Sequence, residues 1–131
     1  MSKDRKDTNS PRIQIIQKLY SNLLNPSETI IYSKHQYKKF IKDVVSGTIE
    51  RNELINETIE KHLMDDLDNK RTDKLLKIII QASVFEFLYK PNSPKNVIIN
   101  EYIKTAEYFL EKAQIKYLNA ILDKISKKLR K

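Results

Sequence analysis

The chain of 131 residues contains a single glycine, Gly47. Loops that cradle phosphates and turns that bind dinucleotides need several glycines, because a Cβ keeps the backbone away from the phosphate. Tight β-hairpins also draw on glycine for positive φ angles. The glycine content therefore excludes both nucleotide motifs, weighs against an all-β fold and favours an all-α one.

The chain also lacks the residues that most catalytic and metal sites require. It has no cysteine, which excludes disulfides, thiolate nucleophiles and thiolate metal sites. Its two histidines, His35 and His62, lie 27 residues apart, without the spacing of a metalloprotease motif. No clustered acid–base pair emerges, so we expect neither an enzyme nor a metal or other cofactor.

Charge and hydropathy point to a partner and a location. The chain carries 25 Lys and Arg against 17 Asp and Glu, a formal charge of +8, which favours an anionic partner. Its N-terminus lacks the apolar core of a signal peptide, and no apolar run approaches the roughly 20 residues that cross a bilayer. We expect a soluble cytoplasmic protein without membrane contact.

Apolar periodicity predicts three helices in the first half of the chain. Residues 1–9 offer nothing apolar after Met1 and are expected to form a flexible arm. Ser10 and Pro11, an N-cap residue and a first-turn proline, open a helix predicted over residues 11–24. A second helix with a lysine-rich face is expected around residues 37–45, and an acidic third one from Ile49 to Leu67.

The second half predicts three more helices. Residues 73–88 are apolar on nearly all sides, as in a buried helix, although a buried strand over Ile78–Ile80 is the competing interpretation. Ser93-Pro94 repeats the cap-and-proline start before a fifth helix, and a basic sixth helix ends near Leu129. We expect one all-helical domain over residues 10–131, with about six to seven helices in two small packed bundles, residues 11–67 and 73–129.

Four short motifs follow one another along nearly the whole chain. They are Arg12-x-x-x-x-Gln17-x-Leu19-Tyr20, Phe85-Glu86-Phe87, Pro94-x-x-Val97-x-Ile99-Asn100-Glu101 and Lys116-Tyr117-Leu118-Asn119-Ala120-Ile121-Leu122-Asp123-Lys124. In this arrangement the chain resembles the NusB family of bacterial transcription antitermination factors. The last two motifs, about 20 residues apart, make the most specific part of the signature.

The resemblance implies an RNA-binding factor without catalytic activity. Members recognise the boxA element of nascent ribosomal RNA together with the small-subunit ribosomal protein NusE. The pair joins the RNA polymerase antitermination complex and supports processive transcription of ribosomal RNA operons. The residues that the resemblance places on RNA are Arg5, Lys6, Arg12, Gln17, Tyr20, Lys116 and Tyr117.

These residues also have plainer interpretations. Arg12 and Tyr20, eight positions apart on one helix, suit a phosphate contact and a stacked base, but Tyr20 also suits core packing. Lys116 and Tyr117 would otherwise be a solvated lysine and a half-buried packing residue. Among the motif residues, Asn119 is favoured as a structural amide.

Two departures from the family pattern alter the expected interfaces. The family's arginine-rich run before the first helix reads Thr8-Asn9-Ser10-Pro11 here, which predicts weaker RNA binding without the protein partner. The family's Glu-Arg-x-x-Leu-Arg element reads Leu76-Lys77-Ile78-Ile79-Ile80-Gln81, so an acid and an arginine are replaced. If the positions of the replaced acid and arginine contact the ribosomal-protein partner, this chain makes that contact with different side chains.

Two rival functions remain open. Ribosomal RNA cytosine methyltransferases can carry an N-terminal domain of the same fold; since the sequence ends at Lys131, we expect no methyltransferase domain, which disfavours this alternative. A helical scaffold or assembly protein without specific RNA binding would use its charge for solubility alone. Pairing of two copies into a homodimer also stays open.

Overall fold

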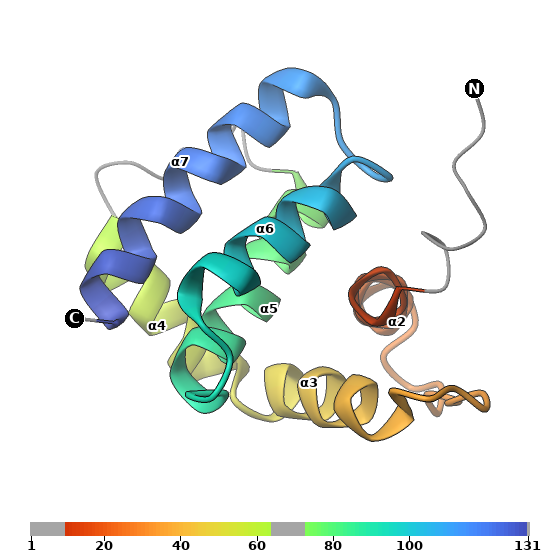
Figure 1. Ribbon diagram of the computed structural model, residues 1–131. Helices are drawn as coiled ribbons and strands as arrows, with labels where there is room; N and C mark the ends of the chain where they lie inside the picture. The colour runs from red at the N-terminus through yellow and green to blue at the C-terminus, as the bar shows by residue number, and fades with distance from the viewer. Residues whose placement is uncertain (1–9, 64–72, 131) are drawn as a thin grey trace.

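The computed structural model describes residues 10–63 and 73–130, which form helices without any strand in these ranges (Figure 1). The all-α prediction is confirmed. The helices are α2 (Pro11–Leu24), α3 (Lys38–Glu50), α4 (Asn52–Leu63), α5 (Lys74–Tyr89), α6 (Lys95–Ala106) and α7 (Lys112–Leu129). The predicted arm over residues 1–9 and the end of the predicted third helix, residues 64–67, lie outside the described residues.

The helix ends follow the predicted proline signals at one of two sites. Helix α2 spans Pro11–Leu24 as expected, with an extended Ser10 before it whose side chain makes no capping bond. At the second site the N-cap is Pro94, with φ −60° and ψ 143°, and α6 begins at Lys95. The prediction of a Ser93 cap was therefore wrong by one residue, because the backbone of Pro94 is extended rather than helical.

The boundary between the second and third helices also differs from the prediction. Ile49 belongs to α3, and the chain leaves that helix at Arg51, whose φ of −104° and ψ of 23° are not helical. Ile49 is therefore an exposed residue of the second helix, with an exposed fraction of 37%, rather than part of the apolar stripe of α4.

Helix α5 is the centre of the described fold. All five other helices pack against it, with α7 above it and α3 below it in the view of Figure 1. Its residues from Ile78 to Phe87 are buried except for the half-buried Gln81, which explains why its sequence is apolar nearly all round. The competing strand over Ile78–Ile80 is therefore wrong.

One hydrophobic cluster connects the whole described fold. Every helix contributes to it, for example Ile15 from α2, Val44 from α3, Ile55 from α4, Ile98 from α6 and Leu118 from α7, all fully buried. These helices thus bury a common core on α5, and the division into two bundles stays a prediction.

Polar side chains fix the start of α5 against the start of α7. The carboxylate of Asp73 accepts a hydrogen bond from the backbone N–H of Leu76, 2.8 Å away, and so caps α5. The same carboxylate accepts a bond from the amide of Gln114 on α7. Gln114 also forms a capping box with Glu111, so one group of side chains sets two helix starts.

Candidate nucleic-acid interface

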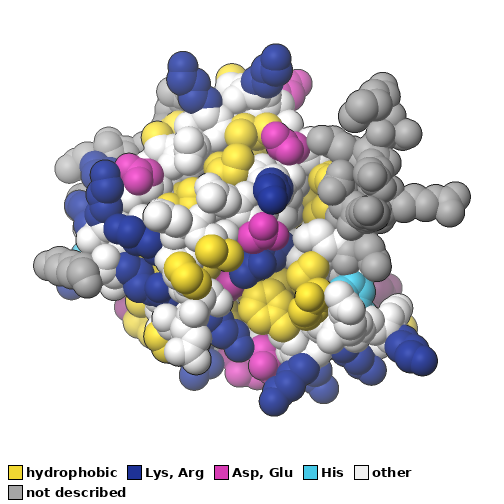
Figure 2. Space-filling model, viewed as in Figure 1, with side chains coloured by type: hydrophobic (Ala, Val, Ile, Leu, Met, Phe, Trp, Pro, Cys, Tyr) yellow, Lys and Arg dark blue, Asp and Glu magenta, His cyan; other side chains and the backbone are white. Residues whose placement is uncertain are grey.

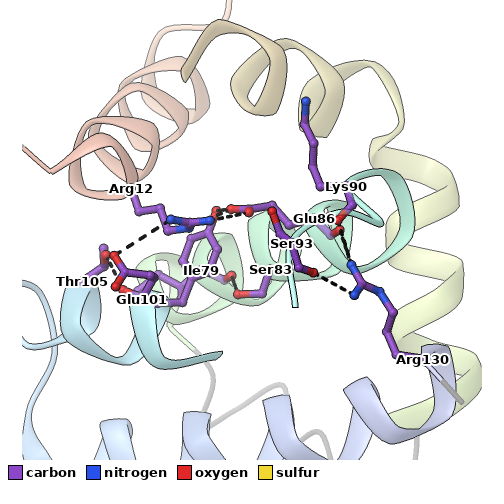
Figure 3. Close-up of polar contacts among 10 residues, drawn as sticks. Arg12, Ile79, Ser83, Glu86, Lys90, Ser93, Glu101, Thr105 and Arg130 are labelled. Atoms are coloured by element: carbon purple, nitrogen blue, oxygen red, sulfur yellow. Dashed lines mark hydrogen bonds and ion pairs between the residues drawn. The ribbon is translucent and has the colours of Figure 1, made fainter. Parts of the chain in front are cut away.

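Arg12, which the resemblance places on RNA, lies inside the protein with an exposed fraction of 9%. Its Nε donates to Oε2 of Glu86 at 3.0 Å and its Nη2 donates to Oε1 at 2.7 Å, a two-point ion pair between α2 and α5. Its Nη1 lies 3.9 Å from Oε1 of Glu101 on α6. Figure 3 shows this guanidinium pointing across toward α5 rather than outward.

Two aromatic rings complete the surroundings of Arg12. The guanidinium carbon lies 5.0 Å from the ring centroid of Phe40 on α3 and 5.4 Å from that of Tyr102 on α6. The Tyr102 hydroxyl, fully buried, donates a hydrogen bond to Glu86. We call Arg12, Phe40, Glu86, Glu101 and Tyr102 the Arg12 network; it joins four helices.

The network holds its groups in definite protonation states. Burial alone lowers the pKa of Arg12, but the hydrogen bond and charge of Glu86, with smaller contributions from Tyr102 and Glu101, raise it above its ordinary value. The pKa of Tyr102 is raised well above its usual range, first because burial penalises the phenolate and second because Glu86 is negative. Arg12 is therefore a cation and Tyr102 a neutral donor at neutral pH.

This geometry gives Arg12 a structural role that the sequence analysis did not foresee. The guanidinium meets the carboxylates of Glu86 on α5 and Glu101 on α6, and the N–H groups that bind Glu86 are not available to a phosphate. The partner is 74 positions away, so local spacing could not identify it. The available signal was Glu86 itself, the lone acid within the apolar stretch of the buried helix.

The other predicted residues of α2 face outward to different degrees. Gln17 is exposed, whereas Tyr20 is half-buried and packs against the core, as its plainer interpretation required. Gln17 lines an open groove of about 350 Å³ between α2 and residues 25–31. There Lys18 Nζ donates to the carbonyl of Ile31 at 2.8 Å and fixes the loop to the helix.

The predicted residues of α7 repeat this pattern. Lys116 is exposed, and Tyr117 is half-buried against the core. Helices α2 and α7 do not pack against each other; both pack on α5 and α6, which lie between them (Figure 1). Each of these two helices therefore carries an exposed polar residue near a half-buried tyrosine: Gln17 near Tyr20 on α2, and Lys116 next to Tyr117 on α7. Arg5 and Lys6 lie outside the described residues.

The positions where the sequence departs from the family's acid-and-arginine element lie inward. Leu76 is buried, with an exposed fraction of 1%, and so packs in the core. Gln81 is half-buried, and its amide donates to the side chain of Asn56 on α4 at 2.9 Å. These two positions therefore support the packing of α5.

Asn119, favoured above as a structural amide, is exposed on α7.

Within residues 10–63 and 73–130, no three His, Cys, Asp or Glu side chains come together as metal ligands. In the same ranges every helix is too short or too polar to cross a membrane.

These features define a small all-helical protein built around one buried helix, with paired polar and tyrosine side chains on its outer helices. A model of the NusB family matches residues 5–127, almost the entire sequence. The chain belongs to the NusB family.

Individual relatives agree with this assignment. The chain is similar to proteins named "Transcription antitermination protein NusB" from Rickettsia massiliae, 28% identical over 138 residues with 88% of each chain covered, and from Lysinibacillus sphaericus, 29% identical over 123 residues with 93% and 96% covered. The relative from Mesorhizobium japonicum is 32% identical over 92 residues, which span 70% of this chain but only 59% of that protein.

A solved structure shows the same fold. The structure of T. maritima NusB superposes with a TM-score of 0.78 at 20% sequence identity, covering 97% of this chain and 93% of the other. The predicted NusB-like architecture is confirmed.

Proposed function

We propose that this protein is a transcription antitermination factor that binds boxA-type single-stranded RNA together with the ribosomal protein NusE. It acts by binding alone, in the cytoplasm, as part of the RNA polymerase antitermination complex that transcribes ribosomal RNA. The observation that carries the proposal is the match to the NusB family over residues 5–127.

The geometry supports specific roles for four residues on this RNA surface. Lys116 is exposed and suits a phosphate, and Gln17 is exposed and suits a base edge or a sugar hydroxyl. Tyr20 and Tyr117 are half-buried, so the core holds each ring while part of it stays accessible for stacking on an unpaired base. Arg5 and Lys6 are proposed as further phosphate contacts.

Arg12 has a different role within this proposal. Its guanidinium is bound by Glu86 and enclosed by Phe40 and Tyr102, so it positions the first turn of α2. Residues Gln17 and Tyr20 follow on the same helix, and their placement therefore depends on that anchor. Arg12 is a positioning residue for the proposed RNA surface.

The test is a titration of fluorescently labelled boxA-type RNA, with and without NusE, read by anisotropy. We expect NusE to tighten binding and a scrambled RNA to bind more weakly. Tyr20→Leu, which keeps the packing but removes the aromatic ring, should weaken binding roughly tenfold. Lys116→Ala should reduce the slope of log K against log salt by about 0.7, the value for one phosphate contact on a single strand.

The matched control is Lys61→Ala, which removes an exposed lysine from α4, a helix that carries none of the proposed contacts. It should leave both affinity and salt slope unchanged. Indifference of the wild-type protein to both the RNA sequence and NusE would contradict the proposal and favour a helical scaffold.

A further inference from the structure

A second open groove lies where α3 meets the C-terminal end of α5, and none of the residues proposed for boxA RNA lines it. Its volume is about 540 Å³, within the range of sites that bind small ligands or single nucleotides. Residues from α3, from α5 and from the chain just after each of these helices form its walls. We call it the α3–α5 groove, lined among others by Lys42, Gly47, Glu50, Arg51, Tyr89 and Lys90.

The groove contains a platform made of one guanidinium and two aromatic rings whose planes are tilted by 35° to each other. The guanidinium carbon of Arg51 lies 4.6 Å from the ring centroid of Tyr89, and the Tyr89 centroid lies 5.1 Å from that of Phe85. A Cβ on Gly47 would lie 2.2 Å from the Phe85 ring, so only glycine lets α3 approach this close. The Arg51 side chain is 46% exposed, and guanidinium planes of this kind stack on unpaired nucleobases.

Two lysines flank this platform, and Arg51 adds a third positive charge within it. Lys42 is exposed, Arg51 lies on the platform itself, and the Lys90 side chain is 28% exposed. Lys38 and Lys39, also exposed, precede Lys42 by about one turn on α3, and Figure 2 shows Lys and Arg side chains gathered along the lower edge of the molecule, over α3. The positive charge of this edge attracts phosphates.

Two carboxylates in the groove restrict which ligand fits. Asp43 Oδ2 lies 3.5 Å from Lys90 Nζ, and Glu50 Oε2 lies 4.0 Å from Arg51 Nη1. Carboxylates accept hydrogen bonds from the amino group of cytosine, whereas uracil presents a carbonyl oxygen at that place. The acidic side chain of a peptide carries no hydrogen-bond donor from which these carboxylates could accept. A base that carries an amino group, attached to a phosphate, satisfies both signs of charge.

We propose that the α3–α5 groove binds a nucleotide of single-stranded RNA whose base carries an amino group, at a site separate from the proposed boxA surface, with cytosine as the test base. The base stacks on Arg51 and donates its amino group to Glu50 or Asp43. Lys42 and Lys90 neutralise the neighbouring phosphates.

The single glycine of the chain provides a direct reporter for this site. Gly47 lines the groove, and its backbone amide is the only glycine signal in an NMR spectrum of the uniformly ¹⁵N-labelled protein. We would titrate that protein with the pentanucleotides rC5 and rU5. The Gly47 signal should shift saturably with rC5, and rU5 should bind roughly tenfold more weakly.

Variants of Arg51 test the stacking. Arg51→Ala should weaken rC5 binding about tenfold. Arg51→Lys keeps the charge but loses the plane, so it should weaken binding nearly as much. Lys61→Ala removes a charge elsewhere and should change nothing. Since Arg51 is about half exposed, these variants should stay folded, which the dispersion of their spectra reports.

Three outcomes would overturn the proposal: no shift of Gly47, equal binding of rC5 and rU5, or unchanged rC5 binding in Arg51→Ala. A shift caused by pentaglutamate but not by rC5 would overturn it in favour of an acidic protein partner.

The double variant Tyr20→Leu, Lys116→Ala separates this site from the boxA surface. It should lose boxA binding in the anisotropy assay and keep the Gly47 response to rC5. Loss of both responses would show that the two sites are one. Failure of the wild-type protein to recognise boxA, with an intact Gly47 response, would contradict the proposed function alone.

Discussion

Two arginines from opposite ends of the described chain converge on Glu86 by different means. Arg12, in the first turn of α2, binds the Glu86 carboxylate from one side. Arg130, directly after α7, donates to backbone carbonyls on the other side: those of Glu86 at 3.3 Å, Phe87 at 2.8 Å, Lys90 at 2.9 Å and Ser93 at 2.8 Å. Figure 3 shows both guanidiniums approaching the end of α5.

The difference between the two contacts lies in what remains when the arginine is lost. Arg12 neutralises a carboxylate whose exposed fraction is 0%, so its removal leaves a buried charge without a counterion. Arg130 donates to the Phe87 carbonyl in the last turn of α5 and to carbonyls that already accept backbone N–H groups, those of Glu86 and Lys90, and it also complements the negative end of the α5 dipole. Lys90 and Ser93 are only partly buried, so water can replace much of this contact. The two anchors therefore differ in strength although they bind neighbouring atoms.

The largest expected effect is that of Arg12→Ala. It should lower the free energy of unfolding by about 3–5 kcal/mol, because the buried Glu86 carboxylate loses its counterion and Tyr102 loses the guanidinium that lies over its ring. The measurement is urea denaturation followed by circular dichroism, analysed with a common slope if the slopes of variant and wild type agree.

The double variant Arg12→Met, Glu86→Gln is the control for this prediction. Glutamine removes the charge and still accepts the hydrogen bond from Tyr102. The double variant should therefore be more stable, by about 1–3 kcal/mol, than the summed losses of the single variants Arg12→Met and Glu86→Gln predict. Simple additivity of the two losses would show that the ion pair is not what stabilises this region.

Arg130→Ala should have a smaller effect, a loss of about 1–2 kcal/mol in the free energy of unfolding. Arg130→Lys keeps the charge at the end of α5 but cannot donate to four carbonyls at once, so it should fall between alanine and wild type. The same urea measurements compare the two ends of the chain directly. A loss from Arg130→Ala as large as that from Arg12→Ala would contradict the distinction drawn between carbonyl and carboxylate partners.

The predictions from sequence succeeded where the signal was local. The bounds of α2 follow from Pro11 and from Asn25-Pro26, and the buried character of α5 follows from its own composition. Both signals act over one or two turns, through the restricted φ of proline and the spacing of apolar side chains.

The environment of Arg12 could not be predicted in this way. Its surroundings depend on Phe40, Glu86 and Tyr102, which come from three other helices and meet only in the tertiary fold. Family resemblance identified Arg12 as important but placed its guanidinium on RNA, whereas the structure places it against a carboxylate. The α3–α5 groove was missed for the same reason, since its cations and its tyrosine lie on elements far apart in the sequence.

The last expected effect separates the two anchors by their response to pH. The pKa of Tyr102 is raised in the folded protein by burial and by Glu86. Below about pH 10, the ordinary pKa of tyrosine, this group is protonated in both the folded and the unfolded chain and adds no pH dependence. Above it the unfolded chain releases the proton first, so the wild-type protein loses stability, by up to about 1.4 kcal/mol per pH unit.

Tyr102→Phe lacks this group, so its deficit relative to wild type should shrink as the pH rises from about 10 toward 12. Arg130→Ala retains Tyr102 and should follow the wild-type slope, because backbone carbonyls do not titrate. Urea denaturation at several alkaline pH values measures the three slopes. If Tyr102→Phe runs parallel to wild type, burial and Glu86 do not hold the phenol neutral, and the two anchors differ in strength alone.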